Sequence, residues 1–124
     1  MDKKSQIAIA AIMGFLAVAL GAFGAHGLSD SLSEKMLETY RTGVFYHIVH
    51  SVVLLVLALS NYKFVKSFIF LTVGILLFSF SLYLYSLTGM KLLAMITPFG
   101  GVSLLIGWIL IVTESRKLDD KNPV

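Results

Sequence analysis

The sequence contains no cysteine and very little charge. Only 14% of its 124 residues are charged, whereas 57% are hydrophobic and the mean hydropathy is +0.88. The lack of cysteine excludes disulfide bonds, thiolate metal sites and thiol catalysis. A soluble domain carries about 25% charged residues, so this composition excludes an ordinary soluble enzyme, a nucleic-acid-binding domain and a disordered tail. We therefore expect a membrane protein with no nucleic-acid partner.

Motifs of common catalytic and nucleotide-binding sites are also missing. The sequence has no Walker-type glycine loop, no nucleophile elbow and no pair of carboxylates suited to acid–base catalysis. Its most glycine-rich stretch, GAFGAHG at 21–27, lies within an apolar segment rather than after a strand. The sequence thus predicts that the protein is not an enzyme, and it indicates no cofactor.

The charged residues all lie outside four long apolar runs. Residues 7–25, 43–60, 67–90 and 92–113 contain no Asp, Glu, Lys or Arg. A membrane-spanning helix needs roughly 17–25 predominantly apolar residues. The predicted fold is therefore an all-α membrane protein, with residues 1–124 forming one domain. Its four transmembrane helices are expected at about 5–27, 43–60, 67–87 and 92–113, with a polar tail at 114–124.

The connection between the first two spans is predicted to contain a short surface helix at about 31–42. Ser31 and Glu34 have the spacing of a capping box, in which two side chains satisfy free amides at a helix start. Apolar side chains then recur every four residues, at Leu28, Leu32, Met36 and Tyr40. This pattern is typical of an amphipathic helix that lies on the membrane surface.

Basic residues predict how the spans are oriented. Four crossings place both ends of the chain and the 61–66 loop on one side of the membrane. That side carries seven basic residues, namely Lys3, Lys4, Lys63, Lys66, Arg116, Lys117 and Lys121. The other side carries three, namely Lys35, Arg41 and Lys91. Because short positive loops stay in the cytoplasm, we expect both termini to be cytoplasmic.

Small residues recur at helical spacing in the first and fourth spans. They are Gly14, Ala17, Gly21 and Ala25 in the first span, and Gly100, Gly101 and Gly107 in the fourth. Helices in lipid associate through close backbone contact at such residues, because burying Leu gives no gain there. We expect these residues to pack toward the bundle centre or against a second copy. The expected partners are the lipid bilayer and either a homo-oligomer or another membrane protein.

Most polar residues of the expected spans fall in the outer half of the membrane. The candidates for a ligand site or polar network are the only three histidines, three other residues of the spans and Tyr40 near the end of the predicted surface helix: His26, His47, His50, Tyr40, Tyr46, Tyr83 and Thr97. Three imidazoles can bind zinc, and imidazole also suits copper, iron and haem. Histidine also titrates near neutrality. Three interpretations remain open: a structural hydrogen-bond network, a metal or haem site, and a proton or substrate path.

Five sequence blocks resemble those of one protein family. The blocks are 21–28, 40–43, the Tyr46-His47 pair with His50, 81–83 and 97–101, and they occur in the family's order and spacing. The chain resembles the small four-span membrane proteins of domain of unknown function family 423, whose eukaryotic relative is transmembrane protein 256. The resemblance covers about residues 6–113. It implies a multi-pass protein of the bacterial plasma membrane but no established reaction, and it matches the family's histidines to His26, His47 and His50.

Together these features favour a non-enzymatic structural or partner-binding membrane component. One alternative is a metal- or haem-binding protein that uses an outer-leaflet histidine cluster. Another is a small oligomeric transporter or channel, which the lack of an intramembrane carboxylate disfavours.

Overall fold

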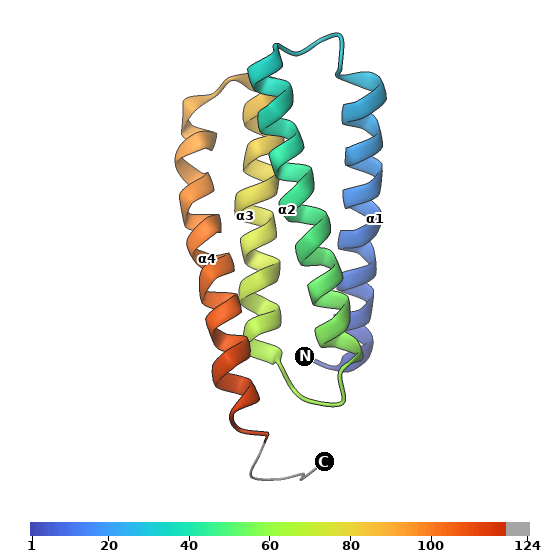
Figure 1. The fold of residues 1–124 in the computed structure, drawn as a ribbon, viewed down its shortest axis with the longest axis vertical. Helices are drawn as coiled ribbons and strands as arrows, with labels where there is room; N and C mark the ends of the chain where they lie inside the picture. The colour runs from blue at the N-terminus through green and yellow to red at the C-terminus, as the bar shows by residue number, and fades with distance from the viewer. Residues whose placement is uncertain (119–124) are drawn as a thin grey trace.

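The computed structural model describes residues 1–118, and over this part of the chain it contains four long helices (Figure 1). They are α1 (Lys3–Gly27), α2 (Glu34–Leu59), α3 (Val65–Thr88) and α4 (Lys91–Ser115). All four are long and apolar enough to cross a membrane. The predicted all-α fold with four spans is therefore confirmed. Of the predicted tail at 114–124, residues 119–124 lie outside the described part.

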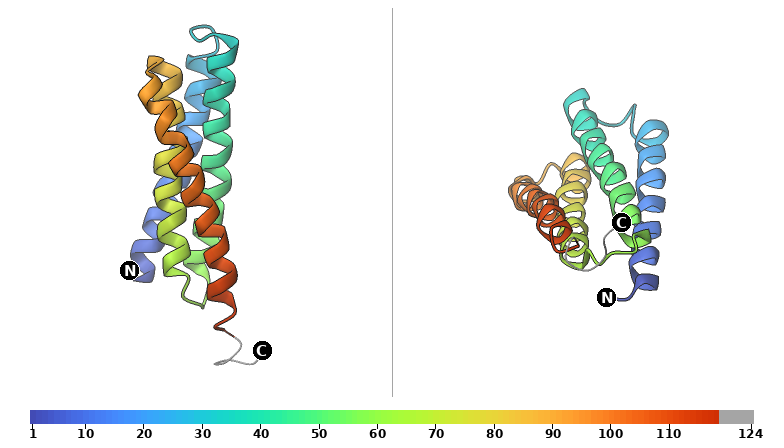
Figure 2. Two further views of the ribbon diagram at one scale, coloured as in Figure 1. Left: turned by 90° about the vertical axis from the view of Figure 1, so that its left-hand side faces the viewer. Right: turned by 60° about the horizontal axis from the view of Figure 1, so that its bottom comes forward.

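Successive helices run in opposite directions, so the start of α1 and the end of α4 lie at the same end of the bundle (Figure 1). We call this the N/C end, and it also holds the 60–64 connection between α2 and α3. The opposite end, which we call the turn end, holds the 28–33 connection and the turn at Gly89 and Met90. Each helix packs mainly against its neighbours in the chain, which leaves α1 and α4 as edge helices (Figure 2).

The predicted surface helix at 31–42 is wrong, because most of this segment is the start of α2. The helix begins at Glu34 and continues without a break to Leu59. Ser33 caps it rather than Ser31, and its hydroxyl accepts a hydrogen bond of 3.2 Å from the amide of Met36. Charged side chains obscured the continuity of the span, but α2 contains no proline to end it, and its one glycine is internal.

The turn between α3 and α4 depends on one glycine. Gly89 has φ = 70°, in the left-handed region that residues with a Cβ rarely adopt. Its amide donates a hydrogen bond of 2.7 Å to the carbonyl of Tyr85 and so ends α3. Because the chain then enters α4 at Lys91, the two helices lie side by side in antiparallel directions.

Two groups of buried apolar side chains join the helices. The larger group draws on all four helices and consists of Ala10, Met13, Leu54, Leu57, Ala58, Phe68, Leu71, Ile75 and Leu104. The smaller one lies near the turn end and consists of Leu28, Tyr40 and Tyr83. Large side chains on the outer surface, such as Phe15 and Phe99, are 72% exposed within the chain. Such outward apolar residues suit contact with lipid.

Close backbone contact joins α3 to α4. A Cβ added to Gly100 would lie 2.3 Å from the amide nitrogen of Phe78, and one added to Gly107 would lie 2.6 Å from the side chain of Leu71. Both glycines were predicted to pack, and both lie at this contact. Gly101 is less constrained, because its nearest neighbour would be 3.7 Å away. The sequence did not single out Gly74, which makes a matching close contact from α3 with Leu104.

The small residues of α1 divide between two faces. Ala17 is buried, and a Cβ on Gly21 would meet Val44 at 3.1 Å, so both face α2 as expected. Gly14 has no atom within 4 Å of an added Cβ, and Ala25 is exposed. These two therefore do not pack toward the bundle centre. The buried residues of α1 are instead Gln6, Ala10, Met13, Ala17 and Gly24.

We predict that Gly100→Ala lowers the free energy of unfolding by about 1–3 kcal/mol, because the added methyl group must push α4 away from the α3 backbone. Gly14→Ala is the matched control, and it should leave stability unchanged or raise it by up to about 1 kcal/mol, since alanine favours helix. Denaturant unfolding in neutral detergent, followed by circular dichroism, measures both. Equal effects of the two alanines would contradict the close contact.

Candidate functional site

The predicted polar residues form several separate contacts between helices. His47 on α2 is fully buried, and its Nδ1 lies 2.9 Å from the hydroxyl of Tyr83 on α3. The ring of Tyr83 packs against that of Tyr40, with centroids 5.0 Å apart. The hydroxyl of Tyr40 in turn donates to the carbonyl of Leu20 on α1. This series of contacts links α1, α2 and α3 toward the turn end.

Gly24 and Gly43 make room for the two tyrosine rings. A Cβ on Gly24 would lie 2.3 Å from the Tyr40 ring, and one on Gly43 would lie 2.9 Å from the Tyr83 ring. No side chain larger than hydrogen fits at either place without moving a ring. The glycines of α1 and α2 thus position the polar contacts as well as the backbones.

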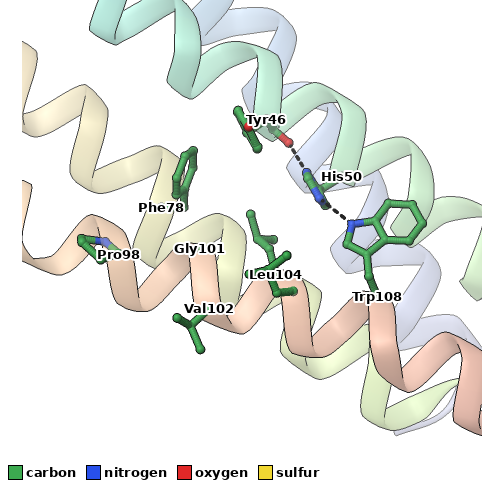
Figure 3. Close-up of a pocket in the computed structure, with 9 residues that line it drawn as sticks. Tyr46, His50, Phe78, Pro98, Gly101, Val102, Leu104 and Trp108 are labelled. Atoms are coloured by element: carbon green, nitrogen blue, oxygen red, sulfur yellow. Dashed lines mark hydrogen bonds between the residues drawn. The ribbon is translucent and has the colours of Figure 1, made fainter.

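His50 links α2 to α4, as Figure 3 shows. Its Nδ1 lies 2.7 Å from the carbonyl oxygen of Tyr46, which can only accept, so Nδ1 carries the proton. The indole N–H of Trp108 can only donate, and it does so to Nε2 of His50 at 3.1 Å. These two bonds select one neutral tautomer and occupy both ring nitrogens.

The contact between His50 and Trp108 lies in the half of the bundle nearer the N/C end. His50 precedes the last residue of α2, Leu59, by nine positions, and Trp108 precedes the last residue of α4, Ser115, by seven. The expectation that the histidines gather in the outer half is therefore wrong for His50. It depended on a second span that starts at 43, whereas α2 starts at Glu34 and places His50 past its midpoint.

A groove of about 440 Å³ lies beside this contact, between α2, α3 and α4 (Figure 3). His50 and Trp108 lie toward its N/C end, and Pro98 lies toward its turn end. Tyr46 and Phe78 pack against each other along its wall, with ring centroids 4.6 Å apart. Most of the lining is apolar, and its one imidazole is already hydrogen-bonded, so the groove suits an apolar occupant such as a lipid chain.

Hydroxyl groups make further contacts between α3 and α4. Thr97 lies 2.7 Å from the hydroxyl of Ser81, and Ser103 donates at 2.8 Å to the carbonyl of Phe70. Thr97 was a predicted site residue, and the structure places it in this pairing rather than with the histidines. These bonds reinforce the interface that the glycines allow to close.

The structure does not bring the three histidines together. His26 is exposed, because it follows Gly24 by two residues and so projects about 200° around the helix from the face that meets α2. No group of three or more His, Cys, Asp or Glu residues within 1–118 is arranged to hold a metal ion. A metal at Nε2 of His50 would also have to displace the bond from Trp108.

Two buried polar atoms among the described residues have no hydrogen-bond partner, namely Nε2 of His47 and the hydroxyl of Ser79. An unpaired buried group costs about 1–3 kcal/mol. A buried water molecule is a common partner for such groups. His47 is therefore buried with no well-formed bond at Nε2, although the backbone of Met13 on α1 lies beside its ring.

Trp108 is a site residue that the sequence analysis did not single out. An indole N–H inside a membrane span needs an acceptor. Neutral histidine supplies such an acceptor, and His50 lies in the span of α2. The need of the indole N–H for an acceptor could have indicated a bond between Trp108 and a histidine. The sequence alone does not tell which histidine is the acceptor.

Comparison with known proteins places the chain among membrane proteins of unknown function. Residues 20–101 match the family model described as "Protein of unknown function (DUF423)". The chain belongs to this family. A UPF0382 membrane protein of Bacillus subtilis, YwdK, is 45% identical over 120 residues, which cover 92% of this chain and 98% of that protein. The UPF0382 inner membrane protein YgdD of Escherichia coli K12 is 40% identical over 127 residues, covering 98% and 97%.

A further relative, a UPF0382 membrane protein of Haemophilus influenzae, is 42% identical over 119 residues, covering 93% of this chain and 96% of that protein. None of these names refers to a reaction, ligand or cofactor. No solved structure matches the chain at a significant level. The chain is thus a membrane protein of a family of unknown function.

We predict that His50→Leu shifts the fluorescence emission of Trp108 to shorter wavelength, because the indole loses its hydrogen-bond acceptor and lies beside a groove with a mostly apolar lining. Trp108 is the only tryptophan, so the signal has one source. His26→Leu removes an exposed histidine far from the indole and serves as the control, with no expected shift. An unchanged spectrum in the His50 variant would contradict the bond.

Proposed function

We propose that this DUF423 protein is a non-enzymatic structural or partner-binding component that associates with another transmembrane helix in the bilayer. One observation carries the proposal: polar side chains within the spans bond between helices, while both edge helices keep an uncovered face. An enzyme or carrier would direct such polar side chains at a substrate. In this structure they bond one helix to another instead.

The outward face of α1 is the surface best suited to such a partner. It combines small residues at Ala11 and Gly14 with Phe15 and Val18, whose side chains are 72% and 63% exposed. The space around Gly14 leaves room for a second backbone to approach, and close approach at small residues favours helix association in lipid. The partner is either a second copy of this chain or another membrane protein.

The two alternative functions have less support. A metal or haem site would need His50, whose ring nitrogens are both bonded, and His26, which is exposed on another face. The proposal therefore includes no cofactor. A proton-coupled transporter would need an intramembrane acid, and the apolar runs at 43–60, 67–90 and 92–113 contain none.

We also propose that the N/C end faces the cytoplasm. The start of α1, the end of α4 and the 60–64 connection all lie at this end, as the alternating helices require. The excess of lysine and arginine on this side supports the orientation, because such residues are retained in the cytoplasm.

Cysteine cross-linking tests the proposed partner face. Because the chain has no cysteine, Ala11→Cys introduces one reactive site on the exposed face of α1. Ala17→Cys is the matched control, since Ala17 is 1% exposed and faces α2. In native membranes treated with a bifunctional maleimide, we expect a discrete adduct from Ala11→Cys only. Its mass identifies a second copy or a different protein, and no discrete adduct would overturn the proposal.

A reporter enzyme that is active only outside the cytoplasm tests the orientation. Fused to the C-terminus, the reporter should be inactive, because both termini are expected inside. Fused after Asp30, in the connection at the turn end, the same reporter should be active. Activity of the C-terminal fusion would reverse the assignment without affecting the partner face on α1.

A further inference from the structure

A second pocket, of about 440 Å³, lies at the N/C end of the bundle, away from the polar contacts of the spans. One wall is the connection between α2 and α3, with Asn61, Tyr62 and Lys63, and the other is the end of α4. Lys66 and Lys117 also line it, and the side chains of all three lysines are exposed. The pocket therefore lies where the helices end and the chain becomes polar.

Glu114 holds the two walls together. Its Oε1 accepts a hydrogen bond of 3.2 Å from the amide of Lys66, and its Oε2 accepts one of 3.1 Å from the amide of Ser67. Oε2 also accepts a hydrogen bond from the hydroxyl of Ser67. Phe64, which precedes α3, supplies no side-chain cap, so a carboxylate from α4 satisfies the free amides instead. The lining carboxylate is thereby directed at the start of α3.

Lys3, from α1, fixes the wall formed by the connection between α2 and α3. Its ammonium donates to the carbonyl of Leu57 at 3.3 Å and to the carbonyl of Tyr62 at 3.0 Å. The first bond reaches the last turn of α2, and the second reaches the connection itself. Because both walls are tied to neighbouring helices, the pocket is formed before any ligand arrives, and a ligand need not order it.

We propose that this pocket binds the phosphate headgroup of an anionic phospholipid. Among the described lining residues, three lysines outnumber the one carboxylate, so the pocket favours an anion. Each ammonium offers three donors to phosphate oxygens, and the Asn61 amide can bond polar headgroup atoms. Basic pockets between helix ends at the membrane surface suit anionic headgroups. The site is separate from the partner face on α1, so either proposal can fail alone.

A bilayer lipid fits the location better than a soluble phosphate. Tyr62 and Leu118 lie beside the lysines and can contact the glycerol and upper acyl chain. Tyrosine is enriched at this depth because its ring is apolar and its hydroxyl is polar. Free phosphate shares the headgroup chemistry but would leave these apolar contacts unused, and this difference allows the two sources to be separated.

Native mass spectrometry of the full chain in neutral detergent tests the site. We expect dioleoyl-phosphatidylglycerol to be retained with an affinity about tenfold higher than dioleoyl-phosphatidylcholine, since each nearby lysine strengthens anionic lipid binding. Lys63→Gln/Lys117→Gln should remove most of this difference. Lys35→Gln/Lys91→Gln also removes two positive charges, but outside the pocket, and this variant should keep the preference for phosphatidylglycerol. All variants are made in the full chain, so Asp119 and Asp120 are present in each and do not contribute to a difference between variants.

Two further measurements make the result decisive. Lys63→Arg/Lys117→Arg should restore selectivity for phosphatidylglycerol, which separates loss of charge from misfolding. Inorganic phosphate, added alone, should neither stabilise the protein as phosphatidylglycerol does nor displace the bound lipid. Equal retention of the two lipids, equal losses in both glutamine variants, or displacement by inorganic phosphate would each overturn the proposal.

Discussion

Close contact between helix backbones is the constraint on which this structure depends. In a bilayer, apolar side chains gain nothing by leaving lipid for the protein interior, so helices must associate through shape and polar bonds. The contact of Gly100 with the backbone of Phe78 brings α4 against α3. Because the chain neighbours α1–α2, α2–α3 and α3–α4 make the main contacts, the fold is open at its edges. This openness leaves outer faces of α1 and α4 to lipid or to a partner.

The polar side chains follow from the same constraint. Once the backbones are close, a donor or acceptor inside a span can reach the neighbouring helix, and leaving it unpaired in lipid is costly. His50 shows how completely this requirement can be met, since both of its nitrogens are bonded and its tautomer is set. His47 meets it only in part, because its Nε2 has no partner. At the N/C end the polar groups act differently, since Glu114 and Lys3 satisfy backbone groups at helix ends and so shape a basic pocket.

Prediction from the sequence succeeded for features that depend on one segment alone. It failed for features that depend on how one segment packs against another. Long uncharged runs predicted all four spans, because the hydrocarbon thickness sets their length. The surface helix at 31–42 was wrong because charge marks where a span becomes polar, not where a helix ends. That error displaced the start of α2 and with it the expected depth of His50. Gly14 and Ala17 both looked like packing residues, yet the position of α2 selects Ala17 alone.

The sequence by itself determined that this chain is a four-span membrane protein of its family, since composition and ordered blocks are local properties. It also determined which residue types are available, including three histidines and no cysteine. Only the tertiary structure decided the pairings: His47 with Tyr83, His50 with Trp108, and His26 with neither. The helical period tells which residues lie on the same face of one helix. The rotation and depth of that helix against another come from packing across the whole interface.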